Sequence, residues 1–284
     1  MIQSSRDQVS YYATRTTPDG YSDLARFHRL VVERYPFTFV RFSDGEMEVI
    51  RNRRMSISGG ITEFRGKFIK NQFPELDQKR FDPISGQDIR RDLLAAAIFS
   101  ECGYFKGVPT RHNNAIGDRE FMLRLNGGFT PQMTFSDLFL NSNLLSSRAS
   151  FFPFLVASFA DLIVVGNWRC ELKGYLEKGR LIQISDDFFS SYQQTLDSVL
   201  AELYEAPESA LILSSASSLS NVLGHQLRIS RPDLTFLDIG TALNDLMGLP
   251  LGTRAYHKLV DPRTLRERFA AWRYRQCREY RLQW

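Results

Sequence analysis

The second half of the chain alternates short apolar segments with longer amphipathic ones. Two of the apolar segments, 162–165 and 211–213, are unbroken runs of Leu, Ile and Val. Unbroken runs are typical of strands in a parallel sheet that is covered by helices on both faces. We therefore predict strands at 161–166, 180–185, 210–214 and 234–237, with a short helix after the first strand and longer helices near 190–204 and 217–227.

The first half shows the same alternation with one long interruption. Helical spacing of apolar residues over 21–34 leads into an aromatic and β-branched strand at 37–42, and a helix opens at Glu46. The segment 52–78 is rich in Gly and polar residues, so we predict a long loop there with room for one short helix. Further elements are expected as a helix at 89–100, a strand at 104–109, a helix at 119–125 and a strand at 133–135.

These elements define the expected fold class. Strands that alternate with helices indicate an α/β protein with a Rossmann-like, mostly parallel sheet and helices on both faces. We expect one main domain over 1–260, followed by a C-terminal helical tail over 261–284.

Composition excludes several protein classes. The chain has 284 residues, of which 43% are hydrophobic and 24% are charged, and these are ordinary values for a globular protein. Its three cysteines lie far apart, so neither a disulfide framework nor a zinc site is expected. The N-terminus lacks the apolar core of a secretory signal, and the apolar run 151–165 is too short to span a bilayer. We expect a soluble, cytoplasmic protein.

The chain has a net charge of +4, and many of its arginines lie in the tail, where they alternate with aromatic residues over 263–284. Such a segment suits contact with anionic headgroups at the inner face of a membrane. It is equally typical of a helix that packs its aromatic side chains on the domain and shows its arginines to water. No nucleic-acid partner is expected.

Asp44 and Glu46 follow the first strand directly. Residues two apart in an extended segment point the same way, and Gly45 between them would let the backbone turn so that both carboxylates converge. Mg²⁺ and Mn²⁺ bind carboxylate oxygens together with phosphate oxygens of a substrate. The alternative is a plain strand-to-helix turn, with Asp44 as the N-cap and Glu46 favouring the helix dipole.

Other predicted strands also end in small or polar residues, which leave room for a phosphate against backbone N–H groups. The sequence contains neither a G-x-G-x-x-G fingerprint nor a P-loop, so it supports no standard dinucleotide or P-loop site. A serine cluster before a helix is also what plain N-capping requires. The candidates for holding a nucleotide ligand are Arg41, Gly45, Asn167, Ser215, Ser217, Asp238 and Gly240.

Two motifs together resemble the GT-D-type glycosyltransferases. They are Arg-Phe-x-Asp-Gly-Glu at 41–46 and Leu-Asp-Ile-Gly at 237–240, and the resemblance spans about 21–246. It implies a Rossmann-like hexosyltransferase in which Asp44 and Glu46 bind Mn²⁺ (or Mg²⁺). The metal in turn would hold the diphosphate of a nucleotide sugar, expected to be UDP-linked, and Arg41 would support the metal pair or the diphosphate. A glycan or lipid-linked acceptor in cell-surface polysaccharide biosynthesis is the expected partner.

Direct displacement at the sugar requires a base that accepts the proton of the acceptor hydroxyl. Asp245, Asp186 and Asp187 are the candidate catalytic residues. A helix that starts near Thr241 would place Asp245 one turn beyond Gly240, close to the same strand edge. Two other functions stay open: a metal-dependent nucleotide-diphosphate hydrolase or phosphotransferase, and a non-catalytic nucleotide-binding module.

Overall fold

The computed structural model describes residues 20–58, 61–64, 67–70, 78–109, 116–140 and 143–250. Helix α2 (Gly20–Val32) precedes strand β1 (Thr38–Arg41), and helix α3 (Asp44–Ile50) follows it. The next elements are β2 (Met55–Ser58), β3 (Ile61–Phe64), β4 (Lys67–Lys70), β5 (Lys79–Phe81), α4 (Gln87–Ile98), β6 (Tyr104–Val108), α5 (Ile116–Leu125) and β7 (Met133–Phe135).

The second half continues the alternation. Its elements are α6 (Leu144–Ser146), the π-helical turn η3 (Ser147–Phe151), α7 (Phe152–Ala157), β8 (Leu162–Asn167), the 3₁₀ turn η4 (Gly174–Leu176), β9 (Arg180–Ile184), α8 (Tyr192–Tyr204), β10 (Leu211–Ser214), α9 (Ser218–Ser230) and β11 (Thr235–Asp238). The four strands and the two long helices expected here are confirmed, with ends that differ by a few residues. The short helix expected after β8 is only the 3₁₀ turn η4, and α6, η3 and α7 were not expected.

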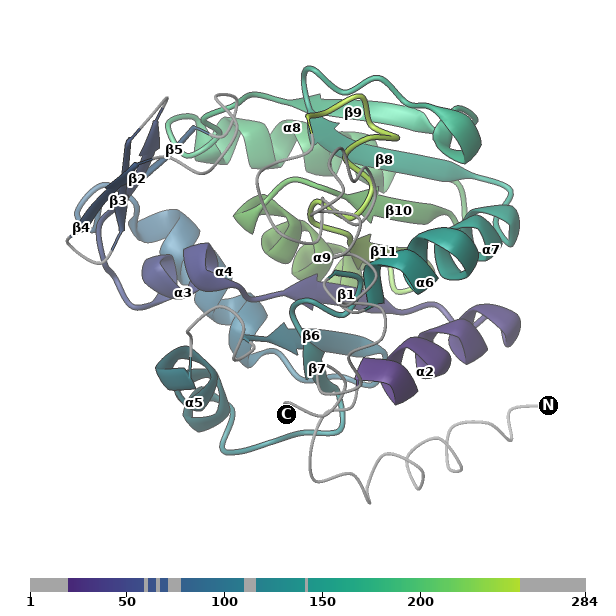
Figure 1. Cartoon of the computed structure of the whole chain (residues 1–284), viewed down its shortest axis with the longest axis horizontal. Helices are drawn as coiled ribbons and strands as arrows, with labels where there is room; N and C mark the ends of the chain where they lie inside the picture. The colour runs from purple at the N-terminus through teal and green to yellow at the C-terminus, as the bar shows by residue number, and fades with distance from the viewer. Residues whose placement is uncertain are drawn as a thin grey trace, which may run out of the picture.

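Seven strands form one sheet in the order β7-β6-β1-β11-β10-β8-β9, and every pair in it is parallel. Figure 1 shows these strands side by side through the middle of the molecule, with helices packed against them. The expected α/β class with a Rossmann-like parallel sheet is therefore confirmed.

The sheet is buried on both faces, which explains its unbroken apolar strands. Neighbouring residues of β1 point to opposite faces: Val40 packs in one core cluster with Met47 of α3 and Leu223 of α9. Phe39 packs in the other cluster with Phe27 of α2 and Leu155 of α7. The two clusters are the two helix-covered faces of the sheet.

The loop expected over 52–78 is a wrong prediction. Strands β2, β3, β4 and β5 form a separate antiparallel sheet in the order β4-β3-β2-β5, which stands beside α3 and α4 at the left of Figure 1. The period-two alternation of Met55-Ser56-Ile57-Ser58 is the strand signal that the Gly-rich composition obscured. Met55 and Ile57, two residues apart on β2, are both buried.

Two expectations lie outside the described residues. These are the domain boundary at 260 and the helical tail over 261–284. Among the helices that are described, none has the length and apolar character needed to cross a membrane.

The contact between α9 and β1 requires a glycine. A Cβ added at Gly224 would lie 2.6 Å from Val40 Cγ1 and 2.9 Å from Phe236 Cε1. We expect Gly224→Ala to lower the free energy of unfolding by about 1–3 kcal/mol, because overpacking displaces the helix. Urea unfolding measures this. The control is Gly117→Ala in α5, where an added Cβ meets nothing within 4 Å, so no loss is expected. Similar losses in both variants would contradict the packing.

Candidate active site

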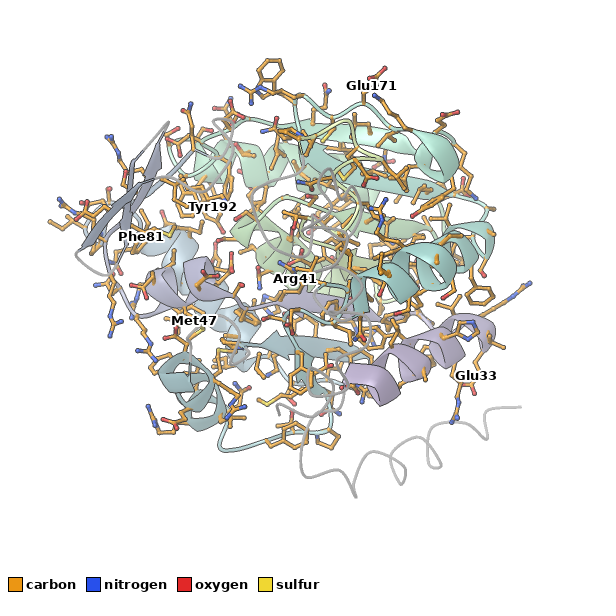
Figure 2. All side chains as sticks on the ribbon, in the orientation of Figure 1. Glu33, Arg41, Met47, Phe81, Glu171 and Tyr192 are labelled. Atoms are coloured by element: carbon orange, nitrogen blue, oxygen red, sulfur yellow. The ribbon has the colours of Figure 1, made fainter. Side chains whose placement is uncertain are left out.

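The site lies where β1 and β11 end, at the carboxyl edge of the large sheet. After β1 the chain turns through α3 towards β6, on one side. After β11 it turns the other way, towards β8, where the backbone N–H of Glu171 donates to the Met247 carbonyl (3.0 Å). A crevice between two strands that the chain leaves in opposite directions is where open α/β sheets bind ligands. Figure 2 shows Arg41, the last residue of β1, near the centre of the molecule.

Arg41, Asp238 and Gly240 form the floor of this edge. Arg41 Nε lies 3.5 Å from Asp238 Oδ2, which makes an ion pair but is long for a strong hydrogen bond. Asp238 Oδ1 accepts the backbone N–H of Gly240 (2.9 Å), and Ser215 Oγ donates to the Gly240 carbonyl (2.7 Å). Asn221 Nδ2 donates to the Arg41 carbonyl (2.7 Å). Four of the predicted ligand-binding residues are thus brought together.

The Arg41 guanidinium is incompletely satisfied. Its Nε and Nη1 are buried and have no hydrogen-bond partner among the described residues. Burial raises the pKa of Asp238 to about 6, against the opposing effect of the Arg41 charge. Two buried N–H groups of Arg41 therefore remain able to donate to an oxygen of a ligand.

The serine turn before α9 forms the second side of the site. Ser217 has φ +52° and ψ −139°, a conformation that non-glycine residues rarely adopt and that costs on the order of 1–3 kcal/mol. Ser214 Oγ and Ser220 Oγ lie 2.8 Å apart, and Ser220 Oγ also accepts the Ala216 N–H (3.0 Å). These two serines therefore hold the turn together. Ser215 and Ser217 are partly exposed at the positive end of the 13-residue helix α9, and the Ser215 hydroxyl is already bonded to the Gly240 carbonyl.

The acidic triplet is helical, which contradicts the extended geometry expected for it. Helix α3 begins at Asp44, so residues 44 and 46 are rotated by about 200° around the helix axis and do not point the same way. Gly45 lies inside that helix and is absent from the described glycines with positive φ. Its added Cβ would meet Met55 Sδ at an ordinary 3.8 Å. The backbone role predicted for Gly45 is therefore wrong.

Glu46 does not fit the metal pair that the resemblance implies. One of its oxygens accepts the Ser43 N–H (3.0 Å) and the other accepts the Ser218 hydroxyl (2.8 Å). Asp44 is partly exposed, and one of its oxygens accepts the Ser43 hydroxyl (3.1 Å). Within the described residues, no group of three or more His, Cys, Asp or Glu side chains could hold a metal ion. In this arrangement the two carboxylates point in different directions and each accepts a hydrogen bond from the protein, and the metal role of Asp44 and Glu46 stays a prediction.

Asn167 and Asp186 form a separate cluster at the ends of β8 and β9. Asp186 accepts hydrogen bonds from Asn167 Nδ2 (2.6 Å), from Trp168 Nε1 (3.3 Å) and from the Arg169 guanidinium. Burial alone would raise the pKa of Asp186, but the hydrogen bonds from Arg169, Asn167 and Trp168 outweigh burial and lower it. A carboxylate with three donors and a lowered pKa is a poor proton acceptor.

Asp187 differs from its neighbour. Burial raises its pKa, against hydrogen bonds that include one from the Arg80 backbone in the small sheet. A raised pKa favours a base, but β9 is four strands away from β1 in the sheet order, which is about 19 Å at ordinary strand spacing. Asp187 follows β9 and contacts Arg80 of the small sheet, and no described contact joins it to Arg41.

Asp245 lies in a turn, and the helix expected from Thr241 is a wrong prediction. Its carboxylate receives two hydrogen bonds from Arg148, at 2.6 and 2.5 Å, and Arg148 Nη1 also donates to the Ala242 carbonyl (2.8 Å). Arg148 belongs to the π-helical turn η3, a feature that is frequent at functional sites. Asp245 thus anchors the segment that covers the end of β11. Its role as a base stays a prediction.

Three residues with contacts at the site were not predicted from the sequence. Arg148, Ser218 and Asn221 each make a long-range contact to the site, across 97, 172 and 180 residues of sequence. Ser218 belongs to the serine cluster, which was the available signal. No local pattern marks Arg148 or Asn221, because their partners are distant in sequence.

Comparisons with known proteins place few constraints on this chain. No family model and no curated protein matches it. Among solved structures, it is similar to a new glycosyltransferase (DUF1792) from Streptococcus sanguinis, at 16% identity over 80% of this chain and 84% of that one, with a TM-score of 0.49.

Two further solved structures of domain of unknown function 1792 are similar to the chain. One, with selenomethionine, has 14% identity, and the other, described as having a distinct glycosyltransferase fold, has 15% identity. Each covers 78% of this chain and 79% of the other chain, with a TM-score of 0.47. At this level of similarity the function must be argued from the residues of the site.

The close packing of Arg41 on Gly240 generates a prediction. Gly240 has φ +49°, and an added Cβ would lie 2.5 Å from Arg41 Cζ. We expect Gly240→Ala to lower the free energy of unfolding by about 1 kcal/mol more than Gly248→Ala. Both variants place an alanine in a left-handed backbone, but only Gly240→Ala also moves the Arg41 guanidinium away from Asp238. At Gly248 (φ +67°) the nearest atoms, on Glu171, lie at 3.3 Å. Equal losses in urea unfolding would argue against this packing.

Proposed function

We propose that this protein is a glycosyltransferase that transfers a hexose from a nucleotide sugar, expected to be UDP-linked, to a glycan or lipid-linked acceptor in cell-surface polysaccharide assembly. Two features support the proposal. The Arg-Phe-x-Asp-Gly-Glu and Leu-Asp-Ile-Gly motifs resemble those of GT-D-type enzymes. The same two motifs end adjacent parallel strands, β1 and β11, so residues about 200 positions apart in sequence meet at one edge.

The main observation behind the proposal is that the buried Arg41 guanidinium has nitrogens without a hydrogen-bond partner among the described residues. These nitrogens are Nε and Nη1, and the one carboxylate with which Arg41 pairs lies at 3.5 Å. Buried donors without an acceptor are costly. The oxygens of the diphosphate of a nucleotide sugar would accept from these donors, beside the partly exposed Ser215.

The chemistry of transfer follows from this arrangement. When the bond between sugar and diphosphate breaks, negative charge develops on the leaving diphosphate. Arg41 and the positive end of α9 would stabilise that charge in a setting that is already organised before the reaction. Asp238 and Asn221 hold Arg41 in place through its side chain and its carbonyl. No step is assigned to a metal, and dependence on Mn²⁺ stays a prediction.

Donor binding tests the proposal. At a concentration 100 times the dissociation constant, a UDP-linked sugar should stabilise the folded protein by about 2.7 kcal/mol and so raise its melting temperature by about 5–10 °C. Arg41→Gln should abolish that rise because the diphosphate loses its counter-charge. Arg231→Gln is the matched control, since Arg231 pairs with Asp233 (2.8 Å) at the start of β11, at the opposite edge of the sheet.

The screen is run with and without Mn²⁺. If the metal takes part through Asp44, the shift requires Mn²⁺ and Asp44→Asn loses it. Failure of every nucleotide sugar to shift the wild-type melting temperature, in either condition, would refute the proposed function. Release of a nucleoside monophosphate and a sugar phosphate, without any transfer, would favour the hydrolase alternative.

Asp245 is the proposed base. If it accepts the proton of the acceptor hydroxyl, Asp245→Asn should reduce transfer by about 10²–10⁴-fold while donor affinity barely changes. The structure adds a control, because Arg148→Gln breaks the same ion pair but keeps the carboxylate. If Arg148→Gln reduces transfer as much as Asp245→Asn does, the loss comes from breaking the ion pair and Asp245 is not the base.

A further inference from the structure

We propose that Glu46 is a positioning residue, which ties the first turn of α3 to the first turn of α9 through Ser218, and that it is not a ligand of a divalent cation. The bearing of this inference on transfer rests on the proposed function. Its structural part does not.

The contacts of Glu46 argue for this role. Its side chain is 7% exposed, and each carboxylate oxygen already accepts one hydrogen bond. The bond from the Ser43 N–H is the backward half of a capping box, which satisfies a donor that the helix leaves open. The bond from Ser218 Oγ joins two segments that are 172 residues apart. The two bonds fix the direction of the carboxylate towards Ser43 and the buried Ser218, so a cation would have to share both oxygens with these donors.

The Glu46 bridge matters because helices α3 and α9 begin beside Arg41 and the serine turn, the two sides of the site. Ser218 is the first residue of α9 and follows Ser217, whose backbone is held at φ +52°. Such a backbone persists where surrounding contacts fix it. Ser43 lies two residues after Arg41, at the end of β1. The Glu46 bridge therefore fixes the serine turn relative to Arg41, and so sets the width of the site between them.

The chemistry of glutamine separates the two roles. A Gln at position 46 can accept the Ser43 N–H through its carbonyl oxygen and donate to Ser218 Oγ through its amide. Glutamine also serves in capping boxes, whereas a neutral amide is a poor ligand for Mn²⁺. A positioning role therefore predicts that Glu46→Gln is tolerated and that Glu46→Ala is not. A ligand role predicts that both variants fail.

The experiment is a set of melting temperatures and transfer rates for Glu46→Gln, Glu46→Ala, Ser218→Ala and the double variant Glu46→Ala/Ser218→Ala. Ser218→Ala should lower the melting temperature by about 2–6 °C and Glu46→Ala by more, since it strands two donors. The double variant should melt close to Glu46→Ala alone, because the two side chains act through one bond. Glu46→Gln should melt within about 2 °C of wild type and keep donor binding and transfer within about 5-fold.

Additive melting shifts would overturn the bridge. Glu46→Gln with a wild-type melting temperature but no Mn²⁺-dependent donor binding would overturn the positioning role and assign Glu46 to the metal. If wild type binds no nucleotide sugar, the proposed function fails, but the comparison of melting temperatures still decides the bridge. Asp44→Asn, in the same helical turn, is the control and should leave the melting temperature unchanged.

Discussion

The position of the Arg41 guanidinium constrains the rest of this structure. It leaves the end of β1, packs on the backbone of Gly240 and pairs at 3.5 Å with Asp238, both at the end of the neighbouring strand β11. That arrangement requires a glycine at position 240 and a buried carboxylate beside the guanidinium. It also requires Asn221, whose side-chain amide donates to the Arg41 carbonyl. A parallel register that aligns the ends of β1 and β11 makes all three possible.

The same edge explains why strain and buried charge gather there. Ser217 holds a rare backbone conformation, and Asp238 has a pKa raised to about 6 by burial. Both cost stability, and such features are common where a protein is organised for a ligand. The parallel sheet offsets this loss of folding free energy, because its two faces are buried in separate hydrophobic clusters. Stability thus comes from the covered sheet, and function is concentrated at its carboxyl edge.

The sequence predicts the large sheet well because its strands are unbroken apolar runs, such as 211–213, separated by amphipathic segments. It fails at 52–78, where glycine and charge obscured a period-two pattern. Strand ends could locate Arg41, Asp238 and Gly240, since parallel strands place their ends together. They could not reveal that α3 begins at Asp44, or that Ser218 and Arg148 contact the site. Local propensity does not encode contacts that depend on tertiary packing.

The central claim is that the edge between β1 and β11 binds a diphosphate through Arg41. A crystal structure of the protein with uridine diphosphate tests this most directly. The account predicts the diphosphate within hydrogen-bond distance of the Arg41 guanidinium and next to the serine turn before α9, with Glu46 still bonded to Ser218. A nucleotide bound elsewhere, with Arg41 still paired to Asp238 alone, would contradict the account.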